Sequence, residues 1–183
     1  MKRTAALALL LCSLAATPSF AALKPGDAAP DFTAMAARGG EAFSFSLAQA
    51  LKKGPVVLYF FPKAFTSGCT AEAHEFAEAA ASFEAAGATL IGMSADNMDT
   101  LHKFSVQECS AKFPVAADPD LKVIKAYDSA LIRVGSYGIA DRISYVIGTD
   151  GKVVYAYSDR NPDKHVENTL AVVKELKAKA ASK

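Results

Sequence analysis

Residues 56–94 read VVLYFFPKAFTSGCTAEAHEFAEAAASFEAAGATLIGMS, and this stretch decides the fold. Residues 56–61 are six consecutive apolar residues bounded by turn residues, a pattern typical of a doubly buried central strand. From about Gly68 to Ala86 apolar residues recur at helical spacing, and Gly87 follows as a helix stop. Residues 88–94 form a second apolar run. Strand, helix and strand at this spacing predict a parallel βαβ unit.

The flanking segments extend this pattern on both sides. Upstream, Asp31-Phe32 and residues 43–47 predict a short first strand and a turn. Downstream, Asp96-Asn97 can cap a second helix, and residues 113–117 predict a further short strand. Asp118-Pro119 predicts another helix start, because a capping carboxylate is followed by proline at the first helical position.

The C-terminal part predicts a β-hairpin followed by a last helix. Residues 143–147 and 153–157 flank Asp150-Gly151, the strongest hairpin signal in the chain. Asn161-Pro162 then opens a helix with one apolar face. A βαβ unit, a helix, a hairpin and a closing helix together predict an α/β domain of the thioredoxin-like fold, with a central mixed β-sheet flanked by helices.

The first 21 residues have the build of a secretory signal peptide. Lys2-Arg3 supplies a positive start, residues 5–16 are almost continuously apolar, and Ser19-Phe20-Ala21 offers small residues for cleavage. The apolar run is too short to span a bilayer. We therefore expect a periplasmic or secreted protein whose single domain is residues 22–183, soluble after cleavage. The alternative is a buried N-terminal helix.

Charge and histidine spacing narrow the choice of ligands. Loss of Lys2 and Arg3 would change the formal net charge from +1 to −1, so there is no general electrostatic case for binding nucleic acid or membranes. The histidines at 74, 102 and 165 lack the close spacing of a metal-ligand set, and we interpret them as surface or capping residues. No metal and no cofactor are predicted.

Two of the three cysteines remain once the signal peptide is removed. Cys12 is lost with it, whereas Cys69 and Cys109 stay in the domain. Export to an oxidising compartment would permit a disulfide between them.

Cys69 stands where the central strand meets the long helix. Unpaired backbone N–H groups and the positive end of the helix dipole favour thiolate over thiol there. The alternative is a small buried cysteine that packs like alanine. Thr66 takes the place of the first cysteine of a C-x-x-C motif, which excludes dithiol exchange within the motif and disfavours a disulfide isomerase or copper carrier. The threonine hydroxyl could instead donate a hydrogen bond to an oxygen substrate above the sulfur.

The loop resembles the active-site signature of a known family. Pro62-x-x-x-Thr66-x-x-Cys69 is similar to that of peroxiredoxins, and the wider run from Phe60 to Glu72 resembles the peroxiredoxin Q (bacterioferritin comigratory protein) branch. The likeness covers most of the chain from residue 25 to residue 166. Mild departures are Ser67 in place of a proline, and Gly148 in place of an acidic residue.

The resemblance implies a thiol peroxidase that reduces hydrogen peroxide and organic hydroperoxides. Cys69 would attack a peroxide oxygen, while Arg142, Thr66 and nearby backbone N–H groups stabilise the developing charge. Pro62 would pack over the sulfur and restrict water. Alternatives are an ion pair of Arg142 with Asp141 or Asp150, and a strand-terminating role for Pro62. Glu72 either orients Arg142 or is an exposed helical residue.

The sequence allows two sources for the second thiol that turnover needs. The family's frequent resolving position is occupied here by His74, so Cys109 is the intramolecular candidate, and an external thiol is the alternative. Bridging Cys69 and Cys109 would require local unwinding of a helix. The resemblance also implies a thioredoxin-like thiol or dithiol reductant and a monomer or weak dimer, with Phe65 as a candidate contact.

A non-enzymatic function is the main alternative. An exported redox sensor would need only a reactive thiol, whereas Thr66 and Arg142 serve turnover. The sequence therefore favours the enzyme.

Overall fold

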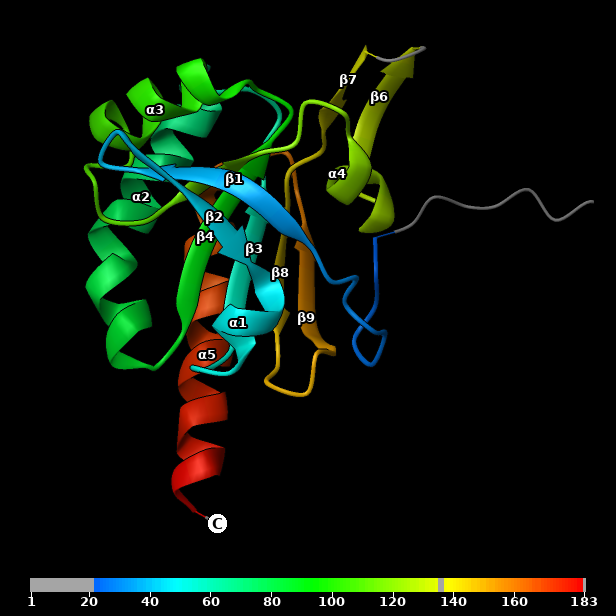
Figure 1. Cartoon of the computed structure of the whole chain (residues 1–183). Helices are drawn as coiled ribbons and strands as arrows, with labels where there is room; N and C mark the ends of the chain where they lie inside the picture. Colours follow the sequence, from blue (N-terminus) through cyan, green and yellow to red (C-terminus); the bar gives the residue numbers. More distant parts are fainter. Residues whose placement is uncertain (1–21, 135–136, 183) are drawn as a thin grey trace, which may run out of the picture.

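The computed structural model describes residues 22–134 and 137–182, and the signal peptide predicted over residues 1–21 lies outside them. No helix in these ranges is both long and apolar enough to span a membrane. Figure 1 shows a central sheet with helices on both sides. The sheet strands are β1 (Thr33–Arg38), β2 (Glu41–Ser46), β3 (Val56–Phe60), β4 (Thr89–Ser94), β5 (Val115–Ala117), β8 (Ile143–Ile147) and β9 (Val153–Ser158).

The sheet is mixed and follows the order β2-β1-β5-β4-β3-β8-β9. Strands β3, β4 and β5 are parallel, so their C-terminal ends meet at one edge. Strand β8 runs antiparallel to β3, and Ile143 pairs with Phe60. This register brings the residue before β8 beside the loop after β3. The predicted thioredoxin-like fold, central buried strand and parallel βαβ unit are confirmed.

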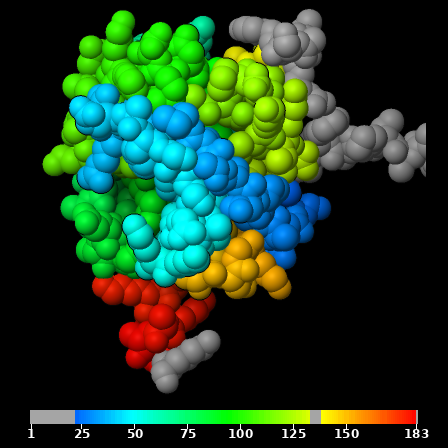
Figure 2. Space-filling view, in the orientation of Figure 1, coloured from blue at the N-terminus to red at the C-terminus, as the bar shows by residue number. Residues whose placement is uncertain are grey.

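Helices cover both faces of the sheet. They are α1 (Leu47–Leu51), α2 (Ser67–Ala85), α3 (Met98–Gln107), α4 (Lys122–Ala126) and α5 (His165–Ala181), the last preceded by a 3₁₀ turn over Pro162–Lys164. Figure 1 shows α5 extending beyond the sheet to the C-terminus, and Figure 2 shows the N-terminal hairpin and α1 covering the front face.

Side chains of β3 point alternately to the two faces of the sheet, and the core is divided into two layers accordingly. Val57 and Tyr59, with Phe61 just after the strand, join the cluster under α2, α3 and α5. Leu58 and Phe60 join the opposite cluster, which includes residues of α1 and α4. All five strand residues are buried because successive side chains point to opposite, equally covered faces.

The predicted start of α4 at Asp118-Pro119 is wrong in position. Helix α4 begins at Lys122, and Leu121 before it has a left-handed φ of 58°. The Asp118 carboxylate still caps the helix, because it accepts hydrogen bonds from the backbone N–H groups of Lys122 at 2.9 Å and Ile124 at 2.8 Å. A turn therefore separates the capping residue from the helix that it caps.

Two hairpins differ from the sequence expectations. The N-terminal segment is a full hairpin of β1 and β2, turning at Gly39-Gly40 with positive φ, rather than one short strand and a turn. Strands β6 (Ala130–Val134) and β7 (Tyr137–Ala140) form a separate two-stranded sheet that was not predicted. The hairpin of β8 and β9 and the last helix after Asn161-Pro162 are confirmed.

Candidate active site

Cys69 lies in the first turn of α2, directly after the loop that leaves β3. Thr66 is the N-cap, and the first helical hydrogen bond runs from Thr70 N to the Thr66 carbonyl at 2.8 Å. The backbone N–H groups of Ser67, Gly68 and Cys69 therefore precede the helical ladder and have no acceptor within the helix. Cys69 is 1% exposed. The thiol therefore lies at the positive end of the helix dipole.

Arg142 is the cation beside this thiol. Its Nη2 is 3.5 Å from Cys69 Sγ, its Nε donates to the Arg160 carbonyl at 2.9 Å, and its Nη1 donates to the Glu72 carboxylate. All three nitrogens are thus engaged. The side-chain ion pair is with Glu72 rather than with Asp141 or Asp150, and Asp141 instead accepts from the Arg142 backbone N–H at 2.9 Å.

Gly68 permits the close approach of the guanidinium to the helix start. A Cβ atom built at this position would lie 3.2 Å from Arg142 Nη2. A larger residue would push the guanidinium away from the helix end that holds the thiol. The close contact with the guanidinium is therefore a steric reason for glycine at position 68.

Glu72 is fully buried, so its interpretation as an exposed helical residue is wrong. Burial raises the pKa of its carboxyl from the usual range to about 8, against the lowering effect of Arg142. Burial alone would lower the pKa of Arg142, but Glu72 and Cys69 raise it and the net shift is upward. One guanidinium charge is therefore shared between two acidic groups, the Glu72 carboxyl and the Cys69 thiol.

Thr66 and Pro62 lie in the same loop as the thiol. The Thr66 hydroxyl donates to the Lys63 carbonyl at 2.9 Å, so in this conformation it offers lone pairs to a ligand rather than its proton. Pro62 is half-buried next to Phe61 at the end of the strand. The loop is held in place because Ala64 N donates to the Asp96 carboxylate at 2.8 Å. Phe65 at its tip has a strained positive φ of 63° and is 43% exposed.

Cys109 lies just beyond the C-terminal end of α3 and is a free thiol, as is Cys69. It is completely buried in the same apolar cluster as Cys69. Burial, followed by the charge of Glu108, raises the pKa of the Cys109 thiol. In this conformation Cys109 is therefore a protonated, protected thiol rather than a nucleophile.

The segment around Cys109 carries both a clamp and backbone strain. His74 Nε2 on α2 lies 2.8 Å from the Glu108 carboxylate, which ties α2 to the end of α3. Ser110 and Ala111 both have positive φ, at 49° and 55°. Two successive non-glycine residues in this region store strain, which release of the segment would relieve.

His165 is a site residue that the sequence analysis missed. It was expected at the surface or as a cap, but it is fully buried at the start of α5. Its Nδ1 lies 2.8 Å from Ser144 Oγ and 3.8 Å from the Glu72 carboxylate, and its Nε2 lies 2.8 Å from the Asp159 carbonyl. One signal was available, because residues 165, 169 and 173 share a helix face, and Thr169 and Val173 are buried too.

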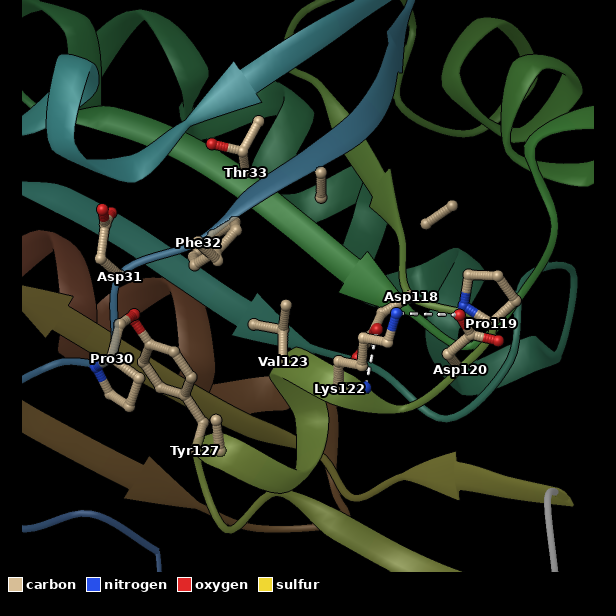
Figure 3. A pocket seen from close by; sticks show the side chains of 13 residues that line it. Pro30, Asp31, Phe32, Thr33, Asp118, Pro119, Asp120, Lys122, Val123 and Tyr127 are labelled. Atoms are coloured by element: carbon tan, nitrogen blue, oxygen red, sulfur yellow. Dashed lines mark hydrogen bonds and ion pairs between the residues drawn. The ribbon is translucent and has the colours of Figure 1, made fainter.

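One pocket of the described residues is separate from this thiol site. It has a volume of about 340 Å³ and lies between the start of β1 and α4, as Figure 3 shows. Two of its polar side chains have protein partners, because Tyr127 donates to the Pro30 carbonyl at 2.8 Å and Asp118 caps α4. Nothing in this pocket points to a ligand, so the chemistry is assigned to the Cys69 cluster.

Comparisons with known proteins show the family of this chain. The sequence profile of the AhpC/TSA family matches residues 25–156. A putative peroxiredoxin bcp of Helicobacter pylori is 33% identical over 81% of this chain and 96% of its own length. A chloroplastic peroxiredoxin Q of rice is 34% identical over 82% of this chain and 67% of its own length.

Solved structures show the same architecture. The crystal structure of peroxidoxin BcpB from Mycobacterium tuberculosis superposes with a TM-score of 0.77 at 30% identity, covering 84% of this chain and 98% of that one. A PrxQ mutant of Xylella fastidiosa superposes with a TM-score of 0.73 at 26% identity, covering 87% of this chain and 99% of that one. With a family profile matched over most of its length and relatives a third identical across four-fifths of it, the chain belongs to the AhpC/TSA family, as a peroxiredoxin of the Q/bcp type.

Proposed function

We propose that this protein is a thiol peroxidase that reduces hydrogen peroxide and organic hydroperoxides with Cys69. The observation that carries the proposal is the placement of Arg142 Nη2 3.5 Å from the Cys69 sulfur at the start of α2. A cation and a helix N-terminus on one thiol favour the thiolate, which is the reacting form. Membership of the peroxiredoxin family supports the same chemistry and does not favour the redox-sensor alternative.

The first chemical step consumes one peroxide and one thiolate. The Cys69 sulfur forms a bond to the terminal peroxide oxygen as the O–O bond breaks, and the sulfur is oxidised to a sulfenic acid while the peroxide is reduced. The departing oxygen takes up a proton and leaves as water or an alcohol. Arg142 and the first backbone N–H groups of α2 would stabilise the negative charge on that oxygen as it develops.

Thr66 and Pro62 would orient and shield the peroxide. Because the Thr66 hydroxyl donates to the Lys63 carbonyl, its lone pairs are free to accept the O–H of a bound hydroperoxide. This differs from the donor role expected from the sequence. Pro62, half-buried beside the loop, would limit access of water to the sulfur.

We infer that Cys109 resolves the sulfenic acid. Attack of the Cys109 sulfur on the oxidised Cys69 sulfur would form a disulfide and release water. Because Cys109 is fully buried beyond α3, its segment must first leave the cluster. Breakage of the His74–Glu108 pair and relief of strain at Ser110 and Ala111 would assist this movement. Resolution by an external thiol is the alternative.

The proposal extends to partner and location. A thioredoxin-like thiol or dithiol protein would reduce the oxidised enzyme, which we expect to be a monomer or a weak dimer. The relatives include chloroplastic plant proteins and bacterial proteins. For this chain we propose periplasmic or secreted location after cleavage near Ala21, on the sequence pattern of residues 1–21.

Two measurements on the cleaved, reduced protein test the proposal. Continuous consumption of hydrogen peroxide with a dithiol reductant is expected, whereas a redox sensor would stop after one equivalent. Intact mass after one equivalent of peroxide then separates the resolving routes. Loss of two hydrogens indicates the Cys69–Cys109 disulfide, and gain of oxygen at Cys69 indicates an external thiol. An unchanged mass would refute the peroxidase function.

A further inference from the structure

His165 connects three of the elements that surround the reacting thiol. Its ring lies between Ser144 on β8, the Asp159 carbonyl after β9 and Glu72 on α2. Tyr157 packs edge-on against it, with ring centroids 4.8 Å apart. A fully buried polar ring in this position needs a reason, because burying polar groups without compensation costs stability.

The hydrogen bonds fix the tautomer of the ring. A backbone carbonyl can only accept, so Nε2 must carry the proton that it donates to the Asp159 carbonyl at 2.8 Å. In the neutral ring Nδ1 then accepts the Ser144 hydroxyl proton, also at 2.8 Å. Burial lowers the pKa of His165, against the raising effect of the Asp159 hydrogen bond, so the neutral ring is favoured.

The Asp159 carbonyl is adjacent to the carbonyl that holds Arg142. Arg142 Nε donates to the carbonyl of Arg160 at 2.9 Å, and this residue directly follows the one that His165 binds. His165 therefore fixes the short backbone segment that receives the guanidinium. Ser144, its other partner, lies on β8, two residues after Arg142.

The neutral ring also keeps Glu72 available to Arg142. The Glu72 oxygen nearest to His165 Nδ1, at 3.8 Å, has no hydrogen-bond partner among the described residues. With Nδ1 occupied by the Ser144 proton, His165 donates nothing to this carboxylate. Arg142 is then its hydrogen-bonding partner, and the guanidinium is held on one side by Glu72 and on the other by the 159–160 backbone.

We propose that His165 is a positioning residue for the peroxidase reaction, which acts through Arg142 by donating from Nε2 to the Asp159 carbonyl. This inference rests on the proposed function, since Arg142 matters through its contact with Cys69. Loss of the Nε2 donor would let the 159–160 segment shift and would move the guanidinium away from the sulfur. The groups that face the ring are Glu72 from α2, Arg142 just before β8, Ser144 from β8, Tyr157 from β9, and Asp159 just after β9.

Two matched substitutions isolate the Nε2 donor. The amide nitrogen of glutamine reaches the place of histidine Nε2, whereas the shorter asparagine reaches only the place of Nδ1. His165→Gln should therefore retain function and His165→Asn should lose it. Val173→Ala removes buried volume from the same helix face, two turns further on, and serves as the control for simple destabilisation.

The first readout is the pH midpoint for alkylation of Cys69 by iodoacetamide, which does not require peroxidase activity. In His165→Asn we expect a rise of about one pH unit and a fall of roughly tenfold or more in the second-order rate constant with hydrogen peroxide. His165→Gln and Val173→Ala should keep the wild-type midpoint. An unchanged midpoint in His165→Asn, or equal shifts in both histidine variants, would overturn the inference.

A second measurement needs no variant and covers the case in which His165→Asn does not fold. Imidazole nitrogen chemical shifts of the wild-type protein should show His165 protonated at Nε2 and unprotonated at Nδ1. The opposite tautomer could not donate to the Asp159 carbonyl and would also overturn the inference. If the wild-type protein failed to consume peroxide, the proposed function would fail, while the alkylation midpoints and the tautomer would still test the positioning of Arg142.

Discussion

The two thiols of the domain are equally buried but lie at opposite kinds of helix end. Cys69 is at the N-terminal end of α2, beside the Arg142 guanidinium. Cys109 follows the C-terminal end of α3, beside the Glu108 carboxylate. The exposed fractions are 1% and 0%, so burial does not distinguish them. Local charge does, because a helix start and a cation favour thiolate, whereas a helix end and an anion favour thiol.

This comparison assigns different tasks to the same functional group. A thiolate can attack a peroxide directly. A buried, protonated thiol does not react with the peroxide and can attack the sulfenic acid of Cys69 once its segment has moved. The contact of His74 with Glu108 and the two successive strained residues, Ser110 and Ala111, lie beside Cys109. The segment of Cys109 therefore has features that would favour its movement.

The largest expected difference is between removal of one thiol and removal of the other. Cys69→Ser should abolish peroxide reduction, because the attacking sulfur is lost. Cys109→Ser should still consume one equivalent of peroxide and accumulate sulfenic acid at Cys69. Single-turnover peroxide consumption with trapping of the sulfenic acid by dimedone measures both. Activity in Cys69→Ser would refute the comparison.

Removing the Arg142 guanidinium should make Cys69 less reactive toward peroxide, as Cys109 is. Arg142→Gln is expected to lower the rate constant with peroxide by roughly 10²–10³-fold, as loss of a donor to a developing oxyanion does elsewhere. It also leaves Glu72 buried without its partner, which should cost about 3–5 kcal/mol of unfolding free energy.

A double variant separates these two effects. Arg142→Gln combined with Glu72→Gln removes both charges and should recover much of the unfolding free energy measured in denaturant, with the rate still low. Recovery of the rate as well would show that the charge on Arg142 is not what activates Cys69.

Removing the Thr66 hydroxyl tests the orientation of the peroxide rather than the ionisation of the thiol. Thr66→Val keeps the shape and removes one hydrogen bond to the reacting oxygens, for which we expect a loss of roughly ten- to a hundredfold in rate. Thr66→Ser should retain most activity. The pH midpoint of Cys69 alkylation should stay the same in both variants, and a clear change in it would assign Thr66 to thiolate stabilisation instead.

The smallest effect is expected at the clamp on the resolving segment. His74→Ala removes a partly exposed contact between the ring and the Glu108 carboxylate. Surface pairs of this kind contribute about 0–1 kcal/mol, so disulfide formation after oxidation should become faster by roughly fivefold at most. Stopped-flow measurement of the second phase after peroxide addition, with His74→Gln as the matched variant, reports this rate. Slower disulfide formation in His74→Ala would mean that the pair guides Cys109 toward Cys69.

Much of the fold was readable from local patterns. Residues 56–61 and 88–94, with the helix between them, are confirmed as β3, β4 and α2 because apolar periodicity is set by burial on the faces of each element. The start of α4 was predicted at the wrong position, and the β6–β7 hairpin was not predicted. The Asp118 carboxylate caps α4 from the far side of a turn, so the cap and the first helical residue are not adjacent in the sequence. Strands β6 and β7 pair only with each other, and their residues show no strong alternation of apolar and polar side chains.

The sequence by itself determined the βαβ frame, the Thr66 and Cys69 spacing at its turn, and the resemblance that pointed to Arg142. These depend on residues that are close in the chain or on a motif that covers a single loop. Only the tertiary structure decided what surrounds the thiol. Glu72 on α2, Arg142 just before β8 and His165 on α5 come together, and His74 on α2 contacts Glu108 beside Cys109. Contacts between residues far apart in the sequence produce no periodic pattern in it, because their energy depends on burial and on distance in the folded chain.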